Sequence, residues 1–188
     1  MLSHLYFESP FKLLINFSIN ITWCRLNCSW LHNVLVNALS TNGIKLGDHV
    51  SIARDSVLLC TAIISIKGTG ITIGNRTGIN ARAYLAGQGG ITIGDDVIMG
   101  PNVQIFSENH NYSDPSIIIK DQGFTKKPVI IGNNCWLGAG VTILGGITIG
   151  DGCVIAAGSV VTKSMPTNSI VAGVPAKVIK SRHLTNDN

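Results

Sequence analysis

The chain has 188 residues, a length that suits one domain with a single hydrophobic core. Hydrophobic residues make up 45% of it and charged residues only 13%, a balance that excludes a disordered chain and a coiled coil. The net charge is +4 and no basic run carries interleaved aromatic residues, so composition argues against nucleic-acid binding and favours an anionic small molecule as partner.

The five cysteines fit neither a metal site nor a disulfide framework. Their number is odd, and Cys24 and Cys28 lack the second pair that zinc-ribbon spacing requires. Cys135 and Cys153, eighteen residues apart, are expected to be small interior thiols. We therefore expect a cytoplasmic protein in a reducing compartment, with no metal.

The first 43 residues form an apolar, tryptophan-bearing segment. Only one charged residue, Arg25, occurs between positions 13 and 44. Asparagines scattered through this stretch argue against a membrane-spanning helix, because each unpaired amide is costly in hydrocarbon. Peripheral membrane association through residues 1–43, and packing on the main domain or on a neighbouring subunit, both stay open.

The secondary structure of this segment is ambiguous in its pattern. From Ile15 to Trp23 apolar residues alternate as in a strand, whereas from Leu26 to Leu35 they recur as in a helix. Asn42-Gly43 is a typical helix end. We expect a helix after residue 25.

From residue 44 onward one aliphatic residue recurs every six positions, with two phase breaks and one long interruption. This period predicts a short strand and a turn, repeated, with the aliphatic side chain always pointing inward. Three such units form a triangular coil, so we expect an all-β solenoid over residues 44–180 followed by a polar tail, 181–188. The positions are Leu46, Ile52, Leu58, Ile64, Ile73, Ile79, Leu85, Ile93, Met99, Ile105, Ile131, Leu137, Ile143, Ile149, Ile155 and Val161.

The repeat stops at an excursion loop, residues 106–128. A solenoid gains no stability from such an interruption, and long loops inside compact domains are more often functional than neutral. This loop carries His110, the only histidine between His49 and His183. An imidazole that titrates near neutral pH is the usual general base, so we expect His110 to be catalytic.

Seven motifs resemble the sugar O-acetyltransferases of the hexapeptide-repeat superfamily, which contains galactoside and maltose acetyltransferases. The Asn109-His110-x-x-x-Asp114 form is most similar to members that acetylate capsule or O-antigen sugars. The resemblance implies a left-handed parallel β-helix, acetyl-CoA as co-substrate, a sugar acceptor, and a homotrimer. The motifs are Gly78–Asn80, Ile91–Asp96, Gly100–Val103, Asn109–His110, Pro128–Gly138, Gly158–Lys163 and Ala172–Lys177.

The resemblance also implies roles for individual residues. His110 is the general base, and Asn80 contacts the acceptor or that base. Asn109 is assigned to acceptor binding, together with Gln88, which replaces an acceptor-binding aspartate of the galactoside enzymes. The donor-binding positions are Trp136, which lines the site, Ala139 and Ala157 at the pantetheine arm, and Thr162, Lys163, Lys177 and Lys180 near the nucleotide and its phosphates.

The residues leave several alternatives to weigh. An acyl-enzyme on Cys135 is disfavoured because this position of the hexad holds a small residue. A zinc carbonic anhydrase needs three converging histidines, and the repeat region offers only His49 and His110. A purely structural solenoid leaves the loop histidine unexplained. N-acetylation of an amino nucleotide sugar remains the main alternative to O-acetylation, and Glu108, Asp114 or a backbone carbonyl could orient His110.

Overall fold

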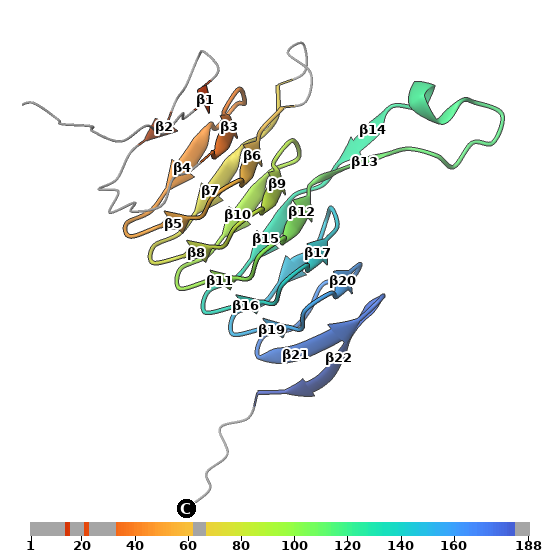
Figure 1. Cartoon of the computed structure of the whole chain (residues 1–188). Coiled ribbons are helices and arrows are strands. Elements are labelled where there is room, and N and C mark those ends of the chain that lie inside the picture. The colour runs from red at the N-terminus through yellow and green to blue at the C-terminus, as the bar shows by residue number, and fades with distance from the viewer. Residues whose placement is uncertain (1–13, 16–20, 23–32, 62–66, 183–188) are drawn as a thin grey trace, which may run out of the picture.

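The computed structural model describes residues 14–15, 21–22, 33–61 and 67–182, which form a three-sided coil of parallel strands with one projecting hairpin (Figure 1). The sides are called face 1, face 2 and face 3 in the order in which the chain visits them. The first corner joins face 1 to face 2, the second joins face 2 to face 3, and the third joins face 3 to face 1.

Each face is one sheet whose neighbouring strands come from successive coils. Face 1 contains β1 (Leu14–Ile15), β3 (Leu35–Asn37), β6 (Val57–Leu59), β9 (Tyr84–Ala86), β12 (Gln104–Phe106), β17 (Thr142–Ile143) and β20 (Val160–Val161). Face 2 contains β2 (Ile21–Thr22), β4 (Ile44–Leu46), β7 (Ile71–Ile73), β10 (Ile91–Ile93), β15 (Val129–Ile131) and β18 (Thr148–Ile149). Face 3 contains β5 (Ser51–Ile52), β8 (Gly78–Ile79), β11 (Ile98–Met99), β16 (Trp136–Leu137), β19 (Val154–Ile155), β21 (Ser169–Gly173) and the antiparallel β22 (Ala176–Ser181).

The six-residue period corresponds to burial, as predicted. Ile131, Leu137, Ile143, Ile149, Ile155 and Val161 are all at most 1% exposed. The earlier members of the series are buried as well, except that Leu46 is half-buried and Ile64 lies outside the described residues. Each coil thus contributes one large aliphatic side chain per face to a continuous core, which explains why the period is strict.

The phase breaks of the repeat all fall at the first corner. After β6 this corner runs to β7, and residues 62–66 within it lie outside the described ranges. After β9 it holds the buried run 87–90, and after β12 it gives way to the excursion. The breaks in the six-residue period thus share a single edge of the prism.

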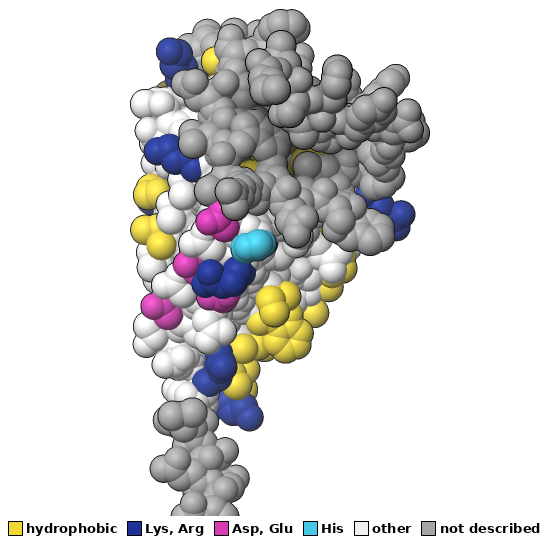
Figure 2. All heavy atoms as spheres, turned by 90° about the vertical axis from the view of Figure 1, so that its left-hand side faces the viewer, with side chains coloured by type: hydrophobic (Ala, Val, Ile, Leu, Met, Phe, Trp, Pro, Cys, Tyr) yellow, Lys and Arg dark blue, Asp and Glu magenta, His cyan; other side chains and the backbone are white. Residues whose placement is uncertain are grey.

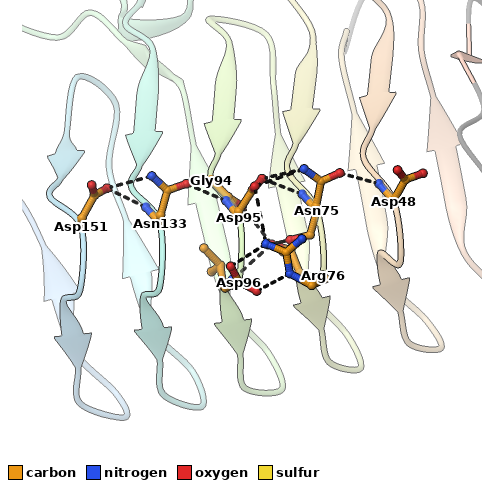
Figure 3. A network of polar contacts seen from close by, with 10 residues as sticks. Asp48, Asn75, Arg76, Gly94, Asp95, Asp96, Asn133 and Asp151 are labelled. Atoms are coloured by element: carbon orange, nitrogen blue, oxygen red, sulfur yellow. Dashed lines mark hydrogen bonds and ion pairs between the residues drawn. The ribbon is translucent and has the colours of Figure 1, made fainter.

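The second corner, by contrast, carries a regular polar column (Figure 3). The backbone N–H of Asn133 donates to Oδ1 of Asp151 at 2.7 Å, and that of Asp95 donates to Oδ1 of Asn133 at 2.9 Å. The N–H of Asn75 donates to Oδ1 of Asp95, and that of Asp48 to Oδ1 of Asn75, both at 2.8 Å. Each accepting side chain, those of Asn75, Asp95, Asn133 and Asp151, thereby bridges two coils and satisfies a turn N–H.

The N-terminal expectation is wrong where the structure describes it. Residues 33–43, predicted as the end of a helix, instead extend the coil: Val36 of β3 pairs in parallel with Leu58 of β6, and Val34 is buried. The spacing of apolar residues fitted a helix, but pairing with the next coil satisfies the backbone here. Most of residues 1–32, including the helix expected from residue 26, lies outside the described residues. Among the described residues, no helix is long and apolar enough to cross a membrane.

Candidate functional site

The excursion is a two-stranded hairpin that leaves the prism at the first corner (Figure 1). Its strands are β13 (Glu108–His110) and β14 (Phe124–Lys126), with a short 3-10 helix, η1 (Ile119–Asp121), near the tip. His110 pairs with Phe124 at the outer end of the ladder. Its side chain is exposed, and within the described ranges no hydrogen bond or ion pair involves it. The hairpin thus presents a free imidazole away from the coil.

Polar contacts just beyond His110 fix the hairpin's shape. Asn111 donates its backbone N–H to the carbonyl of Gly123 at 3.0 Å and accepts from the Thr125 hydroxyl at 2.6 Å. Gln122 donates to the carbonyl of Asp114 at 2.8 Å. These contacts hold the segment after His110, so the histidine sits on an ordered strand end.

Asp114, one of the two carboxylates considered as a partner of His110, is engaged elsewhere. Its Oδ1 accepts hydrogen bonds from the hydroxyl of Ser116 at 2.6 Å and from the Ser116 backbone N–H at 2.9 Å. These bonds, the side-chain one first, lower the pKa of Asp114. Glu108 lies two residues before His110 in β13 and therefore on the same side of the strand. Within the described chain, neither carboxylate forms a hydrogen bond or an ion pair with His110.

The root of the hairpin is built around a buried residue that sequence reasoning missed. Ser107 is 0% exposed; its hydroxyl donates to the carbonyl of Ala86 at 2.6 Å and accepts from the N–H of Gly89 at 2.8 Å. Gln88 beside it is 7% exposed, and its Oε1 has no hydrogen-bond partner among the described residues. Asn109 is exposed. Serine in a turn-rich sequence carries no distinctive signal, which explains the omission.

The third corner exposes backbone rather than side chains. Ala139 and Ala157 occupy equivalent positions in successive coils, and both are exposed. Their N–H groups donate no hydrogen bond within the described residues, whereas the N–H groups of Gly140 and Gly158 donate to the carbonyls of Pro101 and Ala139 at 2.8 Å. The corner therefore offers two unused donors at consecutive levels, about 4.8 Å apart.

Glycines at this corner allow the backbones of successive coils to approach closely, without side chains between them. A Cβ on Gly138 would lie 2.5 Å from the backbone nitrogen of Ala157, and one on Gly100 would lie 2.6 Å from that of Ala139. Two coils higher than Ala139, Asn80 is exposed, and its Oδ1 accepts from the N–H of Ala81 at 2.7 Å. The side-chain amide of Asn80 remains available to a ligand.

Face 3 adds an apolar surface next to this corner. Trp136 is 55% exposed and stands in register between Ile98, which is 62% exposed, and Val154. In Figure 2 the larger group of hydrophobic side chains lies to the lower right of the acidic and basic side chains near the middle of the view. Lys177 and Lys180, both exposed, lie on β22 at the last coil of the same face.

The predicted site residues therefore fall into two groups on one chain. The first corner carries Gln88, Asn109, His110, Thr162 and Lys163. Face 3 and the third corner carry Asn80, Trp136, Ala139, Ala157, Lys177 and Lys180. The strands of face 1 separate the two groups. Within one chain, the coil therefore places His110 and the third corner on different edges of the prism.

The buried thiols do not suit nucleophilic chemistry. Cys60, Cys135 and Cys153 are free and buried. Burial raises the pKa of the Cys135 thiol to about 11, and this thiol lies 3.2 Å from the carbonyl of Gly150 as a hydrogen-bond donor. A neutral, inward-facing thiol is a poor nucleophile at pH 7. Among the described residues, no group of three or more His, Cys, Asp or Glu side chains could hold a metal ion.

Comparison with known proteins agrees with the repeat-based coil. The family model "Hexapeptide repeat of succinyl-transferase" matches residues 128–163. Galactoside O-acetyltransferase of Escherichia coli is 40% identical over 113 residues, which are 60% of this chain and 55% of that protein. The chain spans about half the length of the curated relatives it matches, 42% to 57% for the first five.

Two solved structures resemble the coil. Galactoside acetyltransferase in complex with coenzyme A has a TM-score of 0.55 and 39% identity, over 59% of this chain and 55% of that one. AntD, an N-acyltransferase from Bacillus cereus solved with dTDP and 3-hydroxybutyryl-CoA, has a TM-score of 0.64 and 25% identity, over 80% and 81%. A hexapeptide match is consistent with the left-handed coil expected from the sequence. The chain is thus similar to hexapeptide-repeat proteins, and its relatives include a galactoside O-acetyltransferase.

Proposed function

We propose that the protein is an acyltransferase that moves an acetyl group from acetyl-CoA to a sugar hydroxyl, as in a surface polysaccharide or its precursor. The observation that carries the proposal is the exposed His110 on an ordered hairpin at the long interruption of the repeat, residues 106–128. The coenzyme A complex of the related galactoside acetyltransferase supports the choice of donor.

The third corner suits the donor. The free N–H groups of Ala139 and Ala157 can donate to the amide carbonyls of a pantetheine arm lying along the corner. Trp136 gives this arm an apolar wall, and Lys177 and Lys180 at the end of the coil can pair with phosphates. Lys163 and Thr162 would reach the nucleotide from the first corner of another subunit.

The chemistry proposed is direct transfer. The imidazole of His110 accepts the proton of the acceptor hydroxyl as the oxygen attacks the thioester carbonyl. The carbon–sulfur bond breaks, and the leaving thiolate takes up a proton to give CoA. The side-chain amide of Asn80 is available to hold the acceptor or the base, and turn N–H groups of the coil can stabilise the oxyanion.

This assignment needs more than one chain, since His110 and Asn80 lie on different corners. In a homotrimer of parallel prisms, the hairpin of one subunit would reach the third corner of its neighbour, so each site would combine both groups. A shared site of this kind would account for a base carried on a long projecting hairpin.

Subunit complementation tests the shared site. His110→Ala and Asn80→Ala variants should each be nearly inactive alone. In a mixed trimer, however, a site formed by the hairpin of an Asn80→Ala subunit and the third corner of a His110→Ala subunit contains both intact residues. Random 1:1 mixing should restore about one quarter of wild-type sites. If verified mixed trimers remain inactive, the shared site is contradicted. Either one subunit supplies both residues to the same site, or the two residues do not share a site.

N-acylation of an amino sugar is the second candidate. The likeness to AntD, which covers 80% of this chain, favours it. Turnover of a panel of sugars and amino nucleotide sugars, followed by CoA release, separates the two: preference for amines over the matching alcohols would establish the second candidate.

A further inference from the structure

The outer surface of face 3 has a notch beside the third corner. It spans β5, β8 and β11 and encloses about 280 Å³. Ser51, Gly78 and Ile98 face it from three successive coils, Ile79 and Met99 contribute its floor, and Asn80 stands at its rim.

The notch exists because Gly78 has no side chain. Its neighbours in register are Ser51 above and Ile98 below, and then Trp136. Neither packing nor backbone requires glycine here. A Cβ would meet only the Ser51 hydroxyl, at 3.4 Å, which is ordinary contact, and Gly78 is not among the glycines with positive φ. Gly100 and Gly138, by comparison, have no room for a side chain.

The notch also lies in line with the donor path. That path climbs the third corner from Ala157 to Ala139, and Asn80 is two coils further, about 10 Å along the axis. A thioester that reaches Asn80 therefore directs its acyl group toward the space above Gly78. The exposed side chain of Ile98 makes that space apolar, whereas the buried Ile79 and Met99 point into the core and border it mainly with backbone. Neither of its polar side chains, Ser51 and Asn80, is charged.

We propose that this notch is an acyl-chain pocket, which lets the protein use donors with three or four acyl carbons besides acetyl. The inference rests on the proposed acyltransferase function and deepens it. The reaction is unchanged: a carbon–oxygen bond forms, the thioester carbon–sulfur bond breaks, and the acceptor proton passes through His110 to the CoA thiolate. Only the apolar tail of the acyl group differs, and each buried methylene strengthens binding about fourfold.

The test compares acetyl-, propionyl- and butyryl-CoA as donors by CoA release. The wild type should use butyryl-CoA with a kcat/KM within about tenfold of acetyl-CoA, because the tail has an apolar place to go. Gly78→Val fills the notch, and the butyryl-to-acetyl ratio should fall a further tenfold or more. Gly78→Ala, whose Cβ fits without strain, should lower the ratio by a smaller factor.

Thr72→Val provides a matched control. Thr72 is an exposed strand residue on face 2 of the same coil, so the change adds a β-branched apolar side chain away from the notch. Its donor ratio should equal that of the wild type. Two results would overturn the proposed acyl-chain pocket. One is a wild-type kcat/KM for butyryl-CoA more than a hundredfold below that for acetyl-CoA. The other is a butyryl-to-acetyl ratio that is the same in Gly78→Val and Gly78→Ala. Absence of turnover with every donor would instead overturn the proposed function itself.

Discussion

The second corner of the prism repeats one polar contact from coil to coil, whereas the first corner changes length along the chain. At the second corner Asn75, Asp95, Asn133 and Asp151 each accept a hydrogen bond from the turn next to it. The first corner shows no such column where the structure describes it, outside residues 62–66, and it gives rise to the hairpin that bears His110. The three parallel sheets and the polar column of the second corner hold successive coils in register, and the first corner varies in length without interrupting those sheets.

The largest expected effect is that of His110→Ala. Losing a general base should lower kcat by roughly a hundredfold or more, with little change in donor affinity, because the donor is assigned to the third corner. The melting temperature should stay within error, since the His110 side chain is exposed and has no partner in the described chain. Steady-state kinetics and thermal melts of the purified variant would measure both.

A histidine of the second corner serves as the control. His49 is exposed and has φ of 57°, a conformation that asparagine tolerates, so His49→Asn should leave turnover unchanged. If His110→Ala instead melts early and keeps its kcat, His110 anchors the hairpin, and the first corner would not carry the chemistry.

Leu137→Ala is expected to lower stability, whereas His110→Ala is expected to lower kcat. Leu137 is fully buried on face 3 between Met99 and Ile155, and truncating it should cost about 2 to 5 kcal/mol of unfolding free energy. Chemical denaturation would measure the loss. Ile118→Ala, at the exposed tip of the hairpin, is the contrast and should change the stability of the isolated chain very little. Similar losses in both would mean that the hairpin supports the coil.

Lys163→Ala should have a more moderate effect, confined to the donor. Lys163 is exposed at the first corner of the last coil and is assigned to the nucleotide end of CoA. A charge-assisted contact with a phosphate predicts about tenfold weaker use of acetyl-CoA. Acetyl-pantetheine, which lacks the nucleotide, should lose nothing. Equal losses with both donors would place Lys163 elsewhere.

The sequence was most informative where burial alone decides the structure. Ile143 and Ile149 could be placed inside the prism because only a repeated strand and turn buries a residue every sixth position. The sequence failed at Val34 and Leu35, whose spacing also suits a helix, because pairing with the next coil decides between the two. Ser107, whose hydroxyl closes the hairpin root, carried no local signal because its two partners come from the preceding coil.

The arrangement of the site was less predictable than its residues. His110 and Asn80 could each be singled out by resemblance, but their separation onto different corners follows from which face each strand joins. The notch at Gly78 was likewise invisible in the sequence, since most glycines of the repeat are required by close packing or by positive φ.

The smallest effect is expected at the regular edge itself. Hydrogen bonds from Asn75, side chain first and then backbone, lower the pKa of Asp95 in the folded chain. A carboxyl whose folded pKa is depressed contributes stability above its unfolded pKa, about 3.9, and loses it as the pH falls through the lower folded value. Asp95→Asn keeps an acceptor oxygen but cannot titrate, so its melting temperature should fall less steeply than that of the wild type between neutral pH and pH 3. Asp48→Asn removes the same charge at the end of the column, where the carboxylate accepts no hydrogen bond in the described chain, and should leave the wild-type slope. Identical slopes for wild type and Asp95→Asn would show that the column holds the coils by geometry alone, with no contribution from charge.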